Sequence, residues 1–507
     1  MAMARYAFLR SNIFDLGLYL NIFHNISDHW WLIFYGHVQP LLIPYGFIYN
    51  LFPTSLASFA ILFSQALVIL FSIWAIWHFF GRWAGVATLF YYPIWENALF
   101  DFHLDHLAIP LLAIFFIANF RRRYGLAVFA ALSLILIKEP FALQTVACGI
   151  YLWWLAYSLE DKSKQRYLFT LGVLLFLVGS AWFYVATQWL VPFFTGADNH
   201  LGLASISFNW LGDTPLQAIK KILTHPRILI DEFIQTPKKI LLLGVIFGLL
   251  GFIPLIRPAA LIVAAPLILI PLLSHSKDHY DYANHYTVGV IIPVIVAFND
   301  GLPIAKKWFK RNFGISEHLF SIFLIIWLVF AHWYLTPSPI SRLFWSQKIW
   351  SITWEAYFPS NRTDMIKNAL LTHIPTGNMV SISSQNNLNW GYLANRENYF
   401  SFPLGVETPQ RITDFSNRNF SGLWAYFRYG TPPSNLSHNV YADYVVIDLK
   451  RPLFLIDQGC DWVYGQCNNK KIQDKFLEHV NYCDQHYETL FSQDGFKIYK
   501  RRPSIRL

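Results

Sequence analysis

The sequence predicts an α-helical polytopic membrane protein of about ten spans, followed by a C-terminal external α/β domain. Only 14% of its 507 residues are charged and 55% are hydrophobic, whereas soluble domains carry about 25% charged residues. The apolar residues gather in runs that approach the ~20 residues of a spanning helix. Strand-like alternation occurs mainly near the C-terminal end. These observations indicate a membrane bundle with a smaller water-exposed domain.

Ten apolar segments are long enough, or nearly long enough, to cross a bilayer. They cover roughly 54–80, 84–99, 104–120, 124–138, 141–158, 167–190, 239–256, 258–274, 286–299 and 317–335. Several are shorter than ~20 residues, which fits helices that their neighbours partly shield from lipid.

The basic residues predict the orientation of these segments. When the connections are numbered alternately, the Lys and Arg clusters all fall on one side, at Arg82, 121–123, 161–166, Arg257 and 306–311. Basic loops stay in the cytoplasm. The external side then receives the connections 100–106, 138–140, 191–238 and 275–286. We therefore expect an integral protein of a bacterial inner membrane, with the latter connections on the periplasmic side.

The same count divides the chain into three parts. Residues 1–53 form an external N-terminal segment with amphipathic helices, 54–335 form the transmembrane bundle with the external loop 191–238, and 336–507 form the external soluble α/β domain. In the last part, "MVSISS", "YADYVVIDL" and "FKIYKR" alternate like strands.

The external domain also carries a cysteine pattern. Six residues separate Cys460 from Cys467, so the two can close a small disulfide loop in an oxidising compartment. Cys483 is an alternative partner.

The net charge of +9 does not indicate a nucleic-acid-binding protein. The basic residues stand in short clusters between apolar runs, as they do in cytoplasmic loops of membrane proteins. The sequence has no Walker loop and no GxSxG, HExxH or CxxC motif. Nucleotide hydrolysis on the cytoplasmic side is therefore not supported.

The stretch "FDFHLDH" places Asp101, His103, Asp105 and His106 between two apolar runs. If Asp101 begins the following helix, it caps that helix. Capping explains one aspartate and leaves the other three groups unexplained. Ionisable groups at this depth are costly and usually line a polar cavity. We therefore interpret Asp101 and His103 as site residues, with a divalent metal ion as one role open to this pair.

Further polar residues fall on the same external side, namely Asp15, His37, Lys138, Glu139, His285 and Tyr286. A lysine at this level can hold a phosphate group. The alternative is that Lys138 extends to the interface and pairs with Glu139, and that His285 and Tyr286 are interface anchors. We expect Asp15, His37 and Lys138 to converge with Asp101 on one external cavity, with the carboxylates of Asp15 and Asp101 within about 10 Å.

The chain resembles the family of bacterial and archaeal membrane proteins grouped as domain of unknown function 2079. The stretches that carry the resemblance follow one another along most of the chain: "FLRSNIFDLGLYLNIF", "GHVQPLLIPYGFIYNLFP", "DFHLDHLAIPLL", "IKEP", "LGDTPLQAIKKILTHP", "GFIPLIRPAALIVAAPLIL", "HYDYANHYTVGVIIP" and "IPTGNMVSISSQNNLNWGYLANRENYFSFP". That family is similar in turn to the GT-C superfamily of multi-pass glycosyltransferases, which implies a GT-C-like bundle. The family usually has a spanning helix before "FDLG", and only about a dozen residues precede it here, so we expect that this helix is missing.

The GT-C resemblance implies sugar transfer from a polyprenyl-phosphate-linked donor to an acceptor that the sequence does not identify. In such enzymes an acidic residue of the first external loop acts as base, and Asp15 stands at that position. Asp101 and His103 would complete the acid–base or metal site. Lys138 would bind the donor phosphate, and His37, Glu139, His285 and Tyr286 would help to bind substrate. The alternatives are a membrane transporter or lipid flippase, in which these groups bind substrate or protons, and a non-catalytic membrane scaffold.

Overall fold

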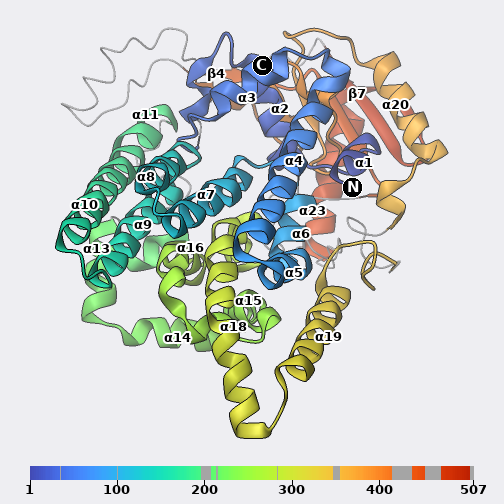
Figure 1. The fold of residues 1–507 in the computed structure, drawn as a ribbon. Coiled ribbons are helices and arrows are strands. Elements are labelled where there is room, and N and C mark those ends of the chain that lie inside the picture. The colour runs from blue at the N-terminus through green and yellow to red at the C-terminus, as the bar shows by residue number, and fades with distance from the viewer. Residues whose placement is uncertain are drawn as a thin grey trace.

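The computed structural model describes residues 1–34, 36–99, 101–195, 207–212, 215–282, 284–345, 354–413, 437–451 and 470–502. The structure is mostly helical, at 71%, and a small sheet lies in its C-terminal part (Figure 1). The predicted class of a helical membrane protein with a C-terminal α/β part is therefore confirmed at this level.

The helical part begins with short helices and continues through longer apolar ones. Its α-helices are α1 (Ala2–Ala7), α2 (Leu18–Asn25), α3 (Leu42–Asn50), α4 (Thr54–Phe80), α5 (Arg82–Phe90), α6 (Tyr92–Leu99), α7 (Ala108–Phe120), α8 (Tyr124–Ser133), α9 (Glu139–Tyr157), α10 (Lys162–Val185), α11 (Val191–Thr195), α13 (Pro215–Thr224), α14 (Arg227–Gln235), α15 (Pro237–Phe247), α16 (Leu261–Leu273), α17 (Lys277–Tyr280), α18 (Ile291–Phe313) and α19 (Glu317–Leu335). Short 3₁₀ or π-helical turns connect them: η1 (Ile13–Gly17), η2 (Trp30–Phe34), η3 (Leu104–Leu107), η4 (Leu134–Leu136), η5 (Ala186–Leu190), η6 (Asn209–Leu211), η7 (Gly248–Leu250), η8 (Ile253–Ile256), η9 (Pro258–Ala260) and η10 (His285–Val290).

Four helices of the described chain are long and apolar enough to cross a membrane. They are Thr54–Phe80, Lys162–Phe194, His285–Phe313 and Glu317–Leu335. A fifth span is possible if α14 and the helix Pro237–Leu250, which meet at 92°, count together. The prediction of ten spans is not confirmed, because several of the predicted segments form shorter or interrupted helices.

The segment 84–99 shows why such an interruption arises. It forms α5 and α6, and Tyr91 between them has extended backbone angles. Pro93 has no N–H to donate to the preceding turn, so a continuous helix would lose a hydrogen bond there. The side chain of Trp95 instead donates to the carbonyl oxygen of Leu89 at 2.6 Å. The proline therefore ends one helix and starts the next.

The C-terminal part is a five-stranded sheet with a helix on each face. The sheet has the order β2-β1-β5-β7-β6. Strand β1 is parallel to β2 and β5, whereas β7 is antiparallel to β5 and β6. A separate antiparallel pair is formed by β3 and β4. The elements are α20 (Asn361–His373), β1 (Ile382–Ser384), α21 (Gly391–Ala394), β2 (Tyr399–Ser401), β3 (Gln410–Thr413), β4 (Ser437–Val440), β5 (Tyr444–Asp448), α23 (Lys470–His486), β6 (Tyr487–Gln493) and β7 (Phe496–Arg501), with the 3₁₀ turn η11 (Trp354–Tyr357) before them.

Strand β5 is buried on both sides, as its sequence predicts. Tyr444 and Val446 pack on the face that α20 covers. Val445 and Ile447 pack on the face that α23 covers. Successive side chains of a strand point to opposite faces, so the run "YVVI" supplies two cores at once. The three stretches that alternate in the sequence all contain strands, namely β1, β5 and β7.

The N-terminal segment packs directly against the C-terminal sheet part. In Figure 1, α1, α2 and α3 lie beside the strands and far from α14 and α19. The contact is partly apolar, because Leu9 belongs to the core cluster of α20 and the sheet. It is also polar. The hydrogen bonds run from Ile13 N to Asn386 O (2.8 Å), from Gly391 N to Tyr6 Oη (2.8 Å), from Arg451 Nη1 to Leu9 O (2.9 Å) and from Asn21 Nδ2 to Ala394 O (3.0 Å).

Candidate functional site

The two predicted acids, Asp15 and Asp101, meet at Asn12. Asp15 lies in the π-helical turn η1, a geometry that is rare and frequent at functional sites. The backbone N–H of Asn12 donates to Asp101 Oδ2 at 2.5 Å, and the Asn12 side chain donates to Asp15 Oδ2 at 3.2 Å. One residue thus holds both carboxylates, although 86 positions separate them in the sequence (101 − 15).

Asp101 does not cap the following helix, contrary to one reading of the sequence. The chain is extended through His103, and η3 begins at Leu104 without a side-chain cap. Asp101 is instead buried against Asn12. Its place in the structure fits a role in a polar cluster better than a role at a helix end.

His103 connects Asp15 to a second histidine. Its Nε2 lies 3.0 Å from Asp15 Oδ1, and its ring stacks on that of His285 with centroids 3.7 Å apart. His285 Nε2 is 3.6 Å from Asp105 Oδ2, and the ring of Tyr286 stacks on His285 at 4.4 Å. Two acid–histidine pairs therefore lie side by side, with their imidazole rings in contact.

Burial sets the protonation of these groups. Burial, followed by the nearby charge of Asp101, raises the pKa of Asp15 to about 7. Burial also raises the pKa of Asp101 to about 6, although Arg5 opposes this. Burial, followed by the neighbouring His285, holds the pKa of His103 well below its usual range. When the proton of neutral His103 is on Nε2, the histidine donates to the carboxylate of Asp15 and orients it.

Lys138 lies near the histidines but pairs with none of the acids. The Lys138–Glu139 pair, which was the alternative interpretation, is not formed, because Glu139 Oε1 contacts His37 Nδ1 at 2.6 Å and Glu139 Oε2 accepts from the backbone of Val38. The half-buried Lys138 has no hydrogen bond or ion pair with the described residues. Its positive charge acts on His103 and His285. The predicted residues thus form two neighbouring groups, one around Asp15 and one around Glu139.

A metal role for Asp101 and His103 is not supported by their surroundings. The described residues contain no group of three or more His, Cys, Asp or Glu side chains placed to hold a metal ion. Asp101 Oδ2 is bonded to Asn12, and His103 Nε2 faces Asp15.

The sequence did not single out several residues that build the site. Asn12 joins the two acids, Gln65 Oε1 accepts from the backbone N–H of His103 at 3.3 Å, and His279 lies against Tyr286 at 4.8 Å. His279 begins the stretch "HYDYANHYTVGVIIP", which was a usable signal. Gln65 is a single amide in an apolar run, Asn12 is one of several polar residues near Asp15, and no sequence pattern marks either.

The C-terminal part also contributes to the site through Asn389. A Cβ placed on Gly17, at the end of the Asp15 turn, would lie 2.7 Å from Asn389 Oδ1 and 3.2 Å from Tyr399 Cε1. A side chain larger than that of glycine would therefore force the Asn389 side chain to shift. Together with the bond from Ile13 N to Asn386 O, this close approach fixes the turn from the side of the sheet.

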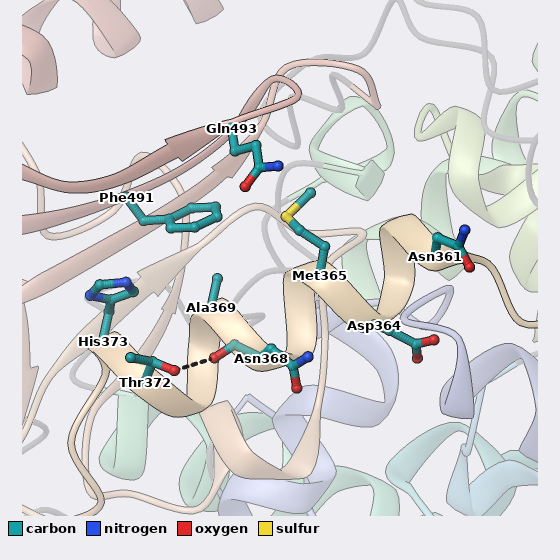
Figure 2. A pocket seen from close by; sticks show the side chains of 9 residues that line it. All are labelled: Asn361, Asp364, Met365, Asn368, Ala369, Thr372, His373, Phe491 and Gln493. Carbon is teal, nitrogen blue, oxygen red and sulfur yellow. Dashed lines mark hydrogen bonds between the residues drawn. The ribbon is translucent and has the colours of Figure 1, made fainter.

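A separate groove lies on the C-terminal part, away from the residues discussed above. It has a volume of 520 Å³ and lies between α20 and the end of β6. Figure 2 shows Phe491 and Gln493 opposite the helix, with Asn361, Asp364 and His373 along it. None of the predicted site residues lines this groove.

A family model described as "Predicted membrane protein (DUF2079)" matches residues 5–422. The match covers more than half of the chain and includes both acids, both histidines and Asn389. The protein belongs to the DUF2079 family. This confirms the resemblance drawn from the sequence, and with the apolar helices it supports an integral membrane protein. A comparison with curated proteins finds no match to this DUF2079 member.

Proposed function

We propose that this protein is a GT-C-like glycosyltransferase that takes a sugar from a polyprenyl-phosphate donor on the external face of a bacterial inner membrane. The observation that carries the proposal is the contact of Asp15 with His103, beside Asp101 and the stacked His285. Transfer to a hydroxyl needs a base near the nucleophile and a positive charge near the leaving phosphate. Asp15 supplies the first and Lys138 supplies the second.

In the proposed reaction, the acceptor oxygen attacks the anomeric carbon of the sugar. Its proton passes to the carboxylate of Asp15 as the new C–O bond forms. The bond from the anomeric carbon to the phosphate oxygen breaks, and the polyprenyl phosphate leaves with the electron pair. Lys138 stabilises the charge on this phosphate. A base with a pKa of about 7 is matched to neutral pH, because it is partly ionised and still accepts a proton readily.

The proposal places residues 1–53 and 336–507 on the same external side. The hydrogen bonds between the N-terminal segment and the sheet part support this placement, since both groups of residues must lie on one side to form them. The division of the chain at residues 53 and 335 stays a prediction.

The first test is donor binding. The purified protein in lipid nanodiscs is mixed with a polyprenyl monophosphate, and binding is measured by native mass spectrometry, with the corresponding polyprenol as a control ligand. We expect Lys138→Gln to weaken binding of the phosphate at least about tenfold and to leave the polyprenol unaffected, because the lysine contacts only the charged group. Lys164→Gln, at an exposed lysine of the basic loop 161–166, is the matched control. Equal binding by wild type and Lys138→Gln would contradict the proposed phosphate site.

The second test is transfer itself. Membranes with wild-type protein are supplied with radiolabelled polyprenyl-phosphate sugars, and products are separated from donor. Asp15→Asn should abolish product formation and leave donor binding intact, because Asp15 acts on the acceptor. The wild-type protein could bind the lipid phosphate and yet transfer none of the donor sugars. That result would reject the proposed transferase activity and leave the proposal of a lipid-phosphate-binding protein.

A proton-coupled transporter is the second candidate, and one observation favours it. The pKa values of the half-buried Asp15 and the buried Asp101 are raised toward neutral pH by desolvation, which is what proton coupling requires. Proteoliposomes that carry a pH gradient distinguish the two functions. Substrate movement that depends on the gradient and on Asp15, without a change in covalent structure, would favour transport over transfer.

A further inference from the structure

Helices α13 and α14 expose their large apolar side chains instead of burying them. The side chains concerned are all more than half exposed: Leu216, Ile219 and Leu223 on α13, and Ile230 and Ile234 on α14. Within each helix they are spaced three or four residues apart, so they form an apolar stripe along each helix. No residue of α14 is buried. Two consecutive helices with such a stripe need an apolar neighbour, because water does not favour so large an exposed apolar surface.

The bend after α14 indicates how this stripe is oriented. α14 meets the following helix, Pro237–Leu250, at 92°. The second helix is apolar, and it exposes Ile240 and Leu241 in the same way. With 14 residues it is about 21 Å long, which reaches into the ~30 Å hydrocarbon layer without crossing it. If this helix runs along the membrane normal, α14 lies parallel to the membrane surface.

The right angle is held by a buried ion pair. Glu232 of α14 accepts from Lys239 Nζ at 2.6 Å, and Lys239 is fully buried with its ammonium 5.2 Å from the ring centre of Tyr280. Glu232 also contacts His275 Nε2 at 3.1 Å. These contacts tie the inner face of α14 to the protein. Ile230 and Ile234 stay exposed while Glu232 is held, so the stripe is a fixed outward surface.

The charges beside the stripe favour a lipid surface. Lys220, Lys221 and Arg227 are exposed on the same two helices, where they outnumber the exposed acid Asp231, which lies 3.9 Å from Arg227. Basic residues that flank an apolar helix face attract anionic headgroups while the apolar side chains enter the upper part of the acyl layer. The exposed surface of Ile240 and Leu241 continues this apolar surface beyond the bend. A lipid bilayer covers both surfaces at once.

We propose that α13 and α14 form an interfacial platform that lies flat in the headgroup layer and binds anionic phospholipid. The platform and the external side of the site then lie at the same depth relative to the membrane surface. The Glu232–His275 contact joins the platform to the connection that carries His279 and leads to His285. The platform therefore sets the depth at which the histidines meet a lipid-linked substrate. This last consequence rests on the proposed function, whereas the platform itself does not.

The test measures the depth of single side chains in a bilayer. The four native cysteines are replaced by alanine, and spin labels are attached at Leu223→Cys or Ile230→Cys in the full-length protein in nanodiscs that contain phosphatidylglycerol. Accessibility to oxygen and to a water-soluble nickel chelate is compared at each site. Leu477→Cys is the matched control, because Leu477 is an exposed leucine on α23 of the sheet part.

We expect the labels at residues 223 and 230 to favour oxygen several-fold over the chelate, and the label at residue 477 to favour the chelate. Replacing phosphatidylglycerol by phosphatidylcholine should make the first two labels more accessible to the chelate. Labels at 223 and 230 that match the label at 477 would overturn the proposal. Spin–spin broadening between copies would also overturn it, by placing a second protein there. Neither result depends on any catalytic activity, so the platform and the glycosyltransferase fail separately.

Discussion

The prediction that most directly tests the site is the effect of Asp15→Asn on stability as pH changes. In the folded protein, burial and Asp101 raise the pKa of Asp15 from 3.8 to about 7. A carboxyl with a raised pKa binds its proton more tightly in the folded state than in the unfolded state. Its ionisation therefore opposes folding, and stability falls as the pH rises from the unfolded pKa through the folded one. Asn carries no such charge, so the variant escapes this loss.

The size of the effect follows from the pKa shift. At about 1.4 kcal/mol for each pKa unit, ionising Asp15 costs the folded state about 4 kcal/mol well above pH 7. About 2.5 kcal/mol of this develops between about pH 5 and about pH 8. The amide side chain also loses one of the contacts to Asn12 and His103, which adds a constant cost of about 1 kcal/mol. Only the pH-dependent part of the difference in unfolding free energy reports on the ionisation of Asp15.

The assay is unfolding of the protein in mixed micelles by sodium dodecyl sulfate, followed through the fluorescence of its 20 tryptophans. We expect the free energy of unfolding of Asp15→Asn, relative to wild type, to rise by about 2.5 kcal/mol from pH 5 to pH 8. Asp28→Asn is the control, because Asp28 is exposed on the same segment. A difference for Asp15→Asn that stays constant with pH, as for the control, would refute the buried and coupled acid pair.

Three further predictions test the packing, the topology and the cysteines. Gly17→Ala should lower the free energy of unfolding by about 1–3 kcal/mol, because the added Cβ would meet Asn389 and Tyr399. Gly125→Ala, whose added Cβ meets nothing within 4 Å, should leave that free energy unchanged, and the double variant Gly17→Ala/Asn389→Ala should regain part of the loss if the clash is real. A cysteine introduced at Arg122 and one introduced at Leu477 should react with impermeant thiol reagents from opposite sides of the membrane, and labelling of both from one side would show that the predicted topology is wrong. Cys460 and Cys467 lie outside the described residues, and non-reducing mass mapping of protein from native membranes should find them paired with each other, whereas Cys483 is buried without a disulfide and should be recovered as a free thiol.

The sequence alone determined the membrane class and the family, and it singled out the residues of the candidate site. Composition and apolar runs separate this chain from soluble proteins, because the bilayer demands apolar helices wherever the chain crosses it. The cluster Asp101–His103–Asp105 was visible for the same reason, since ionisable groups are conspicuous against apolar neighbours. The alternation around Val445 likewise predicted a strand, because strand side chains alternate with a period of two residues.

The number of spans was less predictable, because hydropathy records only composition. Pro93 divides one predicted span into α5 and α6, and the helix after α14 turns by 92°. Such breaks depend on which backbone groups find other partners, as the carbonyl of Leu89 does with Trp95. That information is spread over the packed neighbours of each helix.

Only the tertiary structure decided which residues meet. Asn12 donates hydrogen bonds to both Asp15 and Asp101. Glu139 pairs with His37 and not with Lys138. Asn389 lies against Gly17, although 372 positions separate them in the sequence (389 − 17). A sequence shows which side chains carry charge, but the pairing of charges depends on how helices and sheet pack. Packing removes water from the carboxylates of Asp15 and Asp101 and so raises their pKa values, and no local pattern in the chain records that loss.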